Sequence, residues 1–234
     1  MQPEEDPFEP ARQLWAGRFQ GVLSTQSLAE PGYPFGSVVP YCLDAEGLPL
    51  FLLSHLAQHT RNLDAEPRCA FTVAEPTDKD IQQSLRLTCL GQCSRVPQED
   101  AVATARYVRY FPSAGMYLEA LNFRMYRLRP LRFHYNGGFA TARWAGSERI
   151  VRASPFDEAL RTAVIRCVDS VDAPTLMLSL AVEGPATEPV RVVGLDPWGM
   201  DLRWGDCLRR IPFPRSLMSA TEIDGYLRNG LRSG

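Results

Sequence analysis

Residues 48–74 constrain the fold of this chain more than any other stretch. Leu48 to Leu53 is apolar at every position, which is typical of a strand covered on both faces. The run Arg68 to Ala74 is again largely apolar, and the polar residues between the two runs predict a short helix. A strand, a short helix and a second buried strand are therefore expected here.

The residues that leave the first of these strands form a dense polar cluster. Two interpretations fit it. The free amides and the positive dipole end of the short helix would hold an anion, and a phosphate would suit that position. Alternatively, Ser54 or Thr60 caps the helix and Arg61 is solvated. The cluster consists of Ser54, His55, Gln58, His59, Thr60, Arg61 and Asn62.

Composition excludes several classes of partner. The 234 residues carry a net charge of −2, with 22% charged and 45% hydrophobic residues, so no electrostatic case exists for nucleic acid or a membrane surface. No apolar stretch approaches the roughly 20 residues of a membrane helix. The acidic, proline-rich N-terminus does not resemble a signal peptide. We expect a globular, cytoplasmic protein with a small-molecule substrate.

The six cysteines and three histidines predict no metal site. Cys89 and Cys93 share one face of a predicted strand but lie about 13 Å apart, too far for a disulfide. The cysteines are therefore expected to be buried, free thiols. His55 and His59 have the spacing of a zinc-binding HExxH pair, but position 56 is leucine, so the catalytic glutamate is missing.

Familiar catalytic motifs are also missing. The sequence contains no GxxxxGK[ST] loop, no GxGxxG following a strand and no GxSxG elbow. A Walker-type nucleotide site, a Rossmann dinucleotide site and an α/β-hydrolase nucleophile are therefore unsupported. No catalytic residue can be nominated from the sequence.

The rest of the first 150 residues is rich in strands. A helix is expected over 8–18, and strands over 19–25 and 37–43, the second joined to 48–53 by a tight turn at 44–47. Residues 85–95 alternate, with Leu90 as the exception, so Arg86 lies on the face opposite the core. A helix is expected over 98–110. Residues 123–135 change phase twice, the second time at Pro130, which predicts a bulged or broken strand. Its arginines are either solvated or meet an anion or a partner; they are Arg124, Arg127, Arg129 and Arg132.

The organisation changes near residue 150, which predicts two domains, 1–150 and 151–234. Ser154 and Pro155 begin a helix expected to run to about residue 171. Strands follow at 175–181, 190–195, 200–204 and 207–211, and a final helix spans 220–232. This is a small module of helix, antiparallel sheet and helix.

Three segments carry a resemblance to a known family: SVVPYCLDAEGLPLFLLSHLAQHTRNLDAEPRCAFTV, RLTCLGQC and GGFATARW. They resemble the FMN-binding split barrel of the pyridoxamine 5′-phosphate oxidase-like family, in its haem-utilisation (HugZ-type) branch. The resemblance implies an α+β, mainly β fold: a split β-barrel with a small C-terminal α/β module. It also implies a homodimer with the cofactor between subunits, and FMN-dependent oxidoreductase activity. The FMN contacts implied are Ser37, Ser54, His59, Thr60, Arg61, Asn62 and Arg86.

Two departures from that family keep alternatives open. Gln58 and His59 stand where oxidases of the family carry basic residues, which would weaken phosphate binding. Residues 159–171 also lack the histidines found in the module of many relatives. Haem is the alternative ligand, and its axial ligand would then be His55, His59, His134, a cysteine or a methionine. A barrel without either ligand, acting as an interaction module, is the third alternative.

Overall fold

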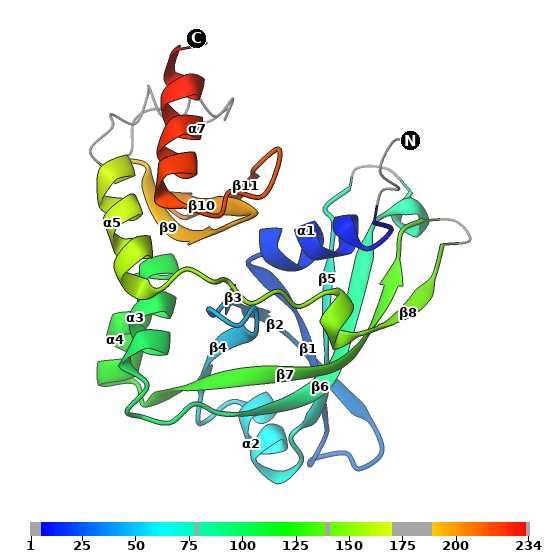
Figure 1. The fold of residues 1–234 in the computed structure, drawn as a ribbon. Coiled ribbons are helices and arrows are strands. Elements are labelled where there is room, and N and C mark those ends of the chain that lie inside the picture. Colours follow the sequence, from blue (N-terminus) through cyan, green and yellow to red (C-terminus); the bar gives the residue numbers. More distant parts are fainter. Residues whose placement is uncertain (1–5, 78–79, 139–140, 170–188, 233–234) are drawn as a thin grey trace. The chain divides into compact units, whose positions relative to one another are not determined.

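A computed structural model describes residues 6–77, 80–138, 141–169 and 189–232. The chain divides into two compact units, residues 1–152 and 153–234, and each is described by itself. Figure 1 shows the elements of both. None of the helices in these ranges has the length and apolar character that crossing a bilayer requires.

The first unit is built on one antiparallel sheet, which contains eight strands in the described residues. Its strand order is β2-β1-β5-β6-β7-β4-β3, and β8 pairs with a further part of β7. Helices α1 and α2 lie at opposite ends of this sheet (Figure 1). The elements are α1 (Glu9–Gly17), β1 (Gln20–Gln26), β2 (Pro34–Pro40), β3 (Cys42–Leu43), β4 (Pro49–Ser54), α2 (Gln58–Ala65), β5 (Arg68–Ala74), η1 (Ile81–Gln83), β6 (Arg86–Arg95), α3 (Ala101–Tyr110), α4 (Ala114–Ala120), β7 (Phe123–Asn136), β8 (Arg143–Gly146) and η2 (Ser147–Arg149).

The inner face of the sheet is filled by aromatic side chains packed around Trp15 of α1. The Trp15 ring lies edge-on to Phe133 at 5.0 Å and to Phe71 at 6.0 Å, measured between centroids. Its Nε1 donates a hydrogen bond to the Gly47 carbonyl at 3.2 Å, and Tyr41 Oη donates to the Trp15 carbonyl at 2.6 Å. The buried indole therefore has a polar partner, as buried tryptophans usually require.

Strand β7 is continuous but bulged, as its phase changes predict. Leu90 pairs with Arg132 and the next residue, Gly91, pairs with Pro130, so Leu131 is left without a partner on β6. Proline has no amide hydrogen to give to the ladder, which favours a bulge there. Alternation alone would put Leu131 on the same face as Phe133 and Tyr135, but as the extra residue it is 73% exposed whereas those two rings are buried.

The hairpin expected between 37–43 and 48–53 forms only in part, because the first strand divides: β2 pairs with β1, and only β3 pairs with β4. The Asp44 carboxylate accepts hydrogen bonds from the amides of Glu46 and Leu48, both at 2.9 Å, and β3 pairs with β4 across the turn. Gly47 has a φ of +79°, which a side chain would disfavour. The turn residues therefore fix the register of this hairpin.

Other expectations need correction at the ends of elements. The helix expected over 98–110 begins only at Ala101, because the Asp100 carboxylate caps it by accepting from the Ala103 amide. The short helix α4 occupies part of a segment expected to be a loop.

The cysteine prediction holds in the barrel but not throughout the chain. Cys42, Cys69, Cys89 and Cys93 are buried free thiols, whereas Cys207, at the start of a hairpin strand, is exposed. Burial raises the pKa of the Cys89 thiol well above its ordinary value, so this thiol stays protonated. Cys167 lies outside the side chains that the structure describes.

In its described residues the second unit contains a three-stranded antiparallel sheet with order β11-β10-β9 and the helices α5 and α7. The guanidinium of Arg210 is almost fully buried between Asp196 and Asp201, with N···O distances of 2.6 and 2.9 Å. The strand expected at 175–181 lies outside the described residues. The elements are α5 (Glu158–Asp169), β9 (Arg191–Asp196), β10 (Gly199–Trp204), β11 (Cys207–Pro212) and α7 (Ala220–Arg232).

Replacement of Gly91 by alanine should destabilise the barrel. A Cβ at Gly91 would lie 2.4 Å from the Arg129 carbonyl oxygen, which is backbone and cannot easily move. We expect a loss of roughly 1–3 kcal/mol in the free energy of unfolding, measured by urea denaturation. Gly115→Ala in α4 is the matched control, because nothing lies within 4 Å of its Cβ position. Equal urea midpoints for Gly91→Ala and the wild type would contradict this account of the bulge.

Candidate functional site

The start of α2 is the first candidate site, because it presents helix amides without a capping side chain. The N-cap residue is Ala57, so neither Ser54 nor Thr60 caps the helix as one interpretation of the sequence holds. Ser54 instead accepts a hydrogen bond from the Leu56 amide through its Oγ at 3.3 Å. The first amides of a helix have no acceptor within the helix, so they are available to an anion here.

Ser37 and His59 are brought together although they lie far apart in the sequence. Ser37 Oγ on β2 and His59 Nδ1 on α2 are 3.1 Å apart. Partial burial of the ring lowers the pKa of His59 below its ordinary value of 6.5, which favours the neutral imidazole at pH 7. The pair therefore offers a hydroxyl and a neutral imidazole beside the start of α2.

Thr60 and Asn62 are buried on the inner side of α2. Asn62 is fully satisfied: its Oδ1 accepts from the Leu28 amide at 3.1 Å and from Gln58 Nε2 at 2.8 Å, and its Nδ2 donates to Thr25 Oγ1 at 2.9 Å. Asn62 therefore fixes α2 against β1. By contrast, Thr60 Oγ1 is buried and has no hydrogen-bond partner among the described residues. Such an orphaned hydroxyl is unusual in a folded protein.

Within one chain, neither Arg61 nor Arg86 lies beside Ser37 and His59. Arg61 is exposed, and its Nη2 donates to Gln58 Oε1 at 3.1 Å. Arg86 begins β6, whereas Arg95, at the other end of that strand, contacts Asp64 of α2. Nine residues of strand separate the two arginines, or about 30 Å. Arg86 therefore lies far from the α2 cluster along the sheet.

A second candidate site lies on the outer face of the same sheet. Register places six outward-facing residues in one row across six strands: Val38, Val22, Thr72, Thr88, His134 and Trp144. Val38 is 72% exposed and Trp144 is 49% exposed, which is unusual for large apolar side chains. The row ends in an aromatic pair, with His134 and Trp144 centroids 4.9 Å apart.

Sequence reasoning did not single out Trp144. The sequence does indicate, from the alternation of residues 85–95, that one face of that strand does not pack against the core. Trp144 joins this face only through the pairing of β8 with β7, and strand pairing cannot be read from the local pattern.

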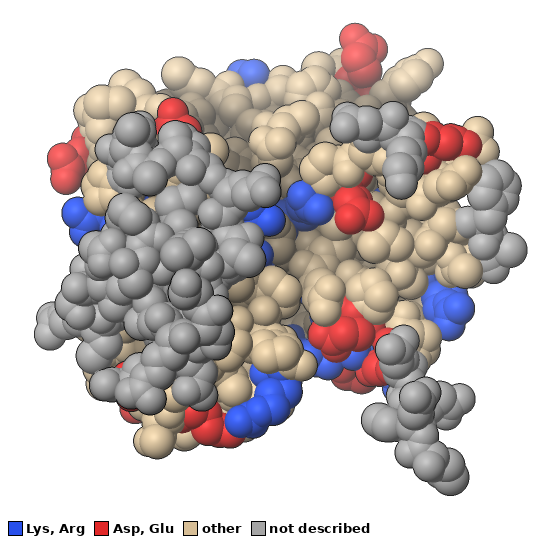
Figure 2. Space-filling model, turned by 90° about the horizontal axis from the view of Figure 1, so that it is seen from above, with Lys and Arg blue, Asp and Glu red and all other residues tan. Residues whose placement is uncertain are grey.

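On the face seen in Figure 2, arginine side chains are interspersed with aspartate and glutamate among uncharged residues. In the described part of the chain no group of three or more histidine, cysteine, aspartate or glutamate side chains is arranged to hold a metal ion.

Comparison with known proteins assigns the fold. The family model described as "CREG, beta-barrel" matches residues 2–149. Among solved structures, a protein of unknown function from Agrobacterium tumefaciens superposes with a TM-score of 0.80 at 22% identity, covering 97% of this chain and 96% of that one. A haem-binding protein from Mycobacterium smegmatis gives 0.57 at 24% identity, covering 100% and 98%. The expected α+β split barrel is confirmed.

One curated relative matches both units. The chloroplastic haem oxygenase HOZ of Arabidopsis thaliana is 27% identical over 228 residues, which cover 93% of this chain and 70% of that protein. Its name agrees with the haem-utilisation branch to which the sequence shows a resemblance. Because the family model covers more than half of the sequence, the chain belongs to the CREG β-barrel family.

Proposed function

We propose that this protein binds haem and takes part in haem degradation. The observation that carries the proposal is the similarity to a haem oxygenase over 93% of the chain, a span that includes both units. A relation confined to the barrel would support only the fold, because split barrels of this kind serve several functions.

The residues present fit haem as a substrate. All three histidines of the chain, His55, His59 and His134, lie in the barrel unit, so a histidine ligand to the iron has to come from there. Haem brings its own iron to the chemistry, and the protein supplies the axial ligand and the surroundings that hold and orient the macrocycle. The second unit would then have a role other than supplying a histidine ligand to the iron.

FMN is a second candidate, and the α2 site favours it. The uncapped helix start, the Ser37 hydroxyl and the orphaned Thr60 hydroxyl would together offer donors to a phosphate monoester. The charge is unfavourable, because Arg61 is turned to Gln58 and no other expected arginine is near. An FMN-dependent oxidoreductase with a weakly held cofactor is therefore the alternative function, with Ser37, Ser54, His59 and Thr60 as its phosphate contacts.

We also propose a homodimer in which a second copy covers the β1, β2 and β5 part of the outer face. Val22 and Val38 form an exposed cross-strand pair, and next to it Thr72 and Thr88 bond to each other through their hydroxyls at 2.9 Å. The exposed groups in this region are therefore apolar or already hydrogen-bonded to each other, so their removal from water costs little free energy.

Haem titration tests the main proposal. Adding haemin to the purified protein should give a saturable Soret shift with an affinity in the micromolar range or tighter. FMN is titrated in parallel and followed by quenching of its fluorescence. If haemin gave no saturable change at tens of micromolar while FMN quenched, the flavin function would replace the haem function. Absence of both would leave an interaction module.

The protonation of His59 tests the flavin alternative. A bound phosphate dianion stabilises the imidazolium and raises the pKa of His59, which burial lowers in the free protein. We expect the ring resonances of His59 in NMR spectra to titrate below pH 6.5 in the free protein and at higher pH with saturating FMN. The His59→Gln variant identifies the resonance. An unchanged midpoint at saturation would place FMN elsewhere.

A charge on the outer face tests the dimer. Val38→Lys should weaken self-association by roughly tenfold or more, since an unpaired charge would have to be buried in the interface. Sedimentation velocity over a range of concentrations measures the effect. Val102→Lys, at a 58% exposed position on α3, is the matched control and should leave the association unchanged. Equal association of both variants would show that the outer face is not the interface.

A further inference from the structure

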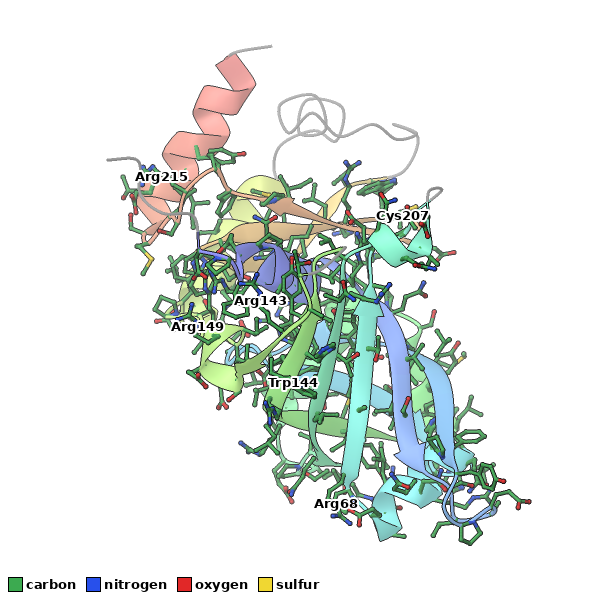
Figure 3. All side chains as sticks on the ribbon, turned by 90° about the vertical axis from the view of Figure 1, so that its right-hand side faces the viewer. Arg68, Arg143, Trp144, Arg149, Cys207 and Arg215 are labelled. Carbon is green, nitrogen blue, oxygen red and sulfur yellow. The ribbon has the colours of Figure 1, made fainter. Side chains whose placement is uncertain are left out.

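Four side chains gather on the outer face, beside the region assigned to the dimer. Arg132 and His134 are alternate residues of β7 and share a face, and Trp144 of β8 is paired directly with His134. The guanidinium carbon of Arg132 lies 4.3 Å from the centroid of the Trp144 ring. Figure 3 looks onto these strands and labels Trp144 on β8.

Arg86 completes this group, which we name the outer-face cluster (Arg86, Arg132, His134 and Trp144). Arg86 pairs with Asn136, two residue pairs beyond Thr88 and His134, and Arg132 pairs with Leu90, two residue pairs before them. The two arginines therefore flank the histidine on either side, separated by about 13 Å along the strands. Arg86 Nη1 donates to the Ile81 carbonyl at 2.8 Å, and the other N–H groups of this guanidinium form no hydrogen bond with the described residues.

Two members of the cluster, His134 and Trp144, have groups that the fold leaves unused. Within the described residues neither ring nitrogen of His134 has a hydrogen-bond partner, whereas Nδ1 of His55 lies 3.2 Å from the Asn122 carbonyl and that of His59 lies 3.1 Å from Ser37 Oγ. Trp144 keeps about half of its surface in water. An exposed indole between an imidazole and a guanidinium is costly to leave uncovered and is typical of recognition surfaces.

The chemistry of the cluster fits one kind of ligand in all its parts. The indole face accepts a flat aromatic ring system, the imidazole offers a nitrogen to a metal, and the two guanidinium groups pair with carboxylates. A metalloporphyrin dicarboxylate has these three features in one molecule. On the basis of the haem function proposed above, we infer that the outer-face cluster is the haem site and that His134 is the axial ligand.

The carboxylate of Glu148 would oppose the binding of a porphyrin dicarboxylate. The Glu148 carboxylate occupies the space above Gly146, the residue paired with Arg132, at 2.3 Å from where a Cβ of Gly146 would be. No ion pair within 4 Å joins Glu148 to an arginine in the described residues. Its negative charge would repel a propionate held by Arg132, so Glu148→Gln should tighten binding of haemin two- to fivefold. A weaker or unchanged affinity would contradict carboxylate recognition at Arg132.

Two porphyrins separate the roles within the cluster. Haemin is followed by its Soret band and metal-free protoporphyrin IX by its fluorescence. His134→Ala should weaken haemin binding tenfold or more and alter the axial-ligand bands, with added imidazole restoring them, while protoporphyrin IX binding changes less than twofold. Trp144→Ala should weaken both ligands, and Trp144→Phe should recover most of the loss.

The control variant is His55→Ala, which removes an imidazole outside the cluster and should change neither titration. Far-ultraviolet circular dichroism confirms that each variant is folded. If Trp144→Ala does not fold, the titrations of Trp144→Phe and Glu148→Gln test the site in its place. If the wild type binds no haemin, the proposed function itself fails. If the wild type binds haemin and His134→Ala and Trp144→Ala bind it equally well, the haem function stands and this site is wrong.

Discussion

The ladder between β6 and β7 is the constraint on which the barrel unit depends. It joins all of Arg86–Arg95 to most of β7 and is interrupted once, where Gly91 meets Pro130. Because side chains alternate along a strand, the extra residue at this point exchanges the two faces of β7. Tyr126 and Leu128 point inward before it, and Phe133 and Tyr135 point inward after it. Gly91 is required because the Arg129 carbonyl leaves no room for a side chain.

This exchange of faces decides where a ligand can bind. The interior is occupied by Trp15 and the aromatic rings around it, each buried to within a few per cent of its surface. Filling of that kind gives the barrel its stability. The candidate sites are at the start of α2 and on the outer face of the sheet, where His134 lies because its neighbours Phe133 and Tyr135 point inward.

The two candidate sites suit different chemistry. The α2 site offers amides, hydroxyls and a neutral imidazole, which suit a phosphate but lack a cation. The outer-face cluster offers two cations, a flat aromatic surface and an unused imidazole, which suit a planar dicarboxylate that carries a metal. The similarity to a haem oxygenase over both units supports the second chemistry as the main function.

Local pattern was sufficient for much of the fold. The buried strands on either side of α2, the hairpin at 42–54, the bulge at Pro130 and the α+β split barrel followed from apolar periodicity, turn residues and motif resemblance. These features depend on residues close together in the chain, so the sequence carries them directly. Ser37 and His59 could be named as members of one site through the resemblance, but their 3.1 Å contact could not be derived from spacing.

Non-local pairing set the rest. Leu131 is exposed because its register against β6 skips it, Arg86 is remote from α2 because β6 runs the length of the sheet, and Trp144 meets His134 only when β8 folds back on β7. Each depends on which strands become neighbours and in what register, a choice made by the packing of the whole core. Periodicity in one strand assigns a residue to a face, but its neighbours on that face come from strands distant in the chain.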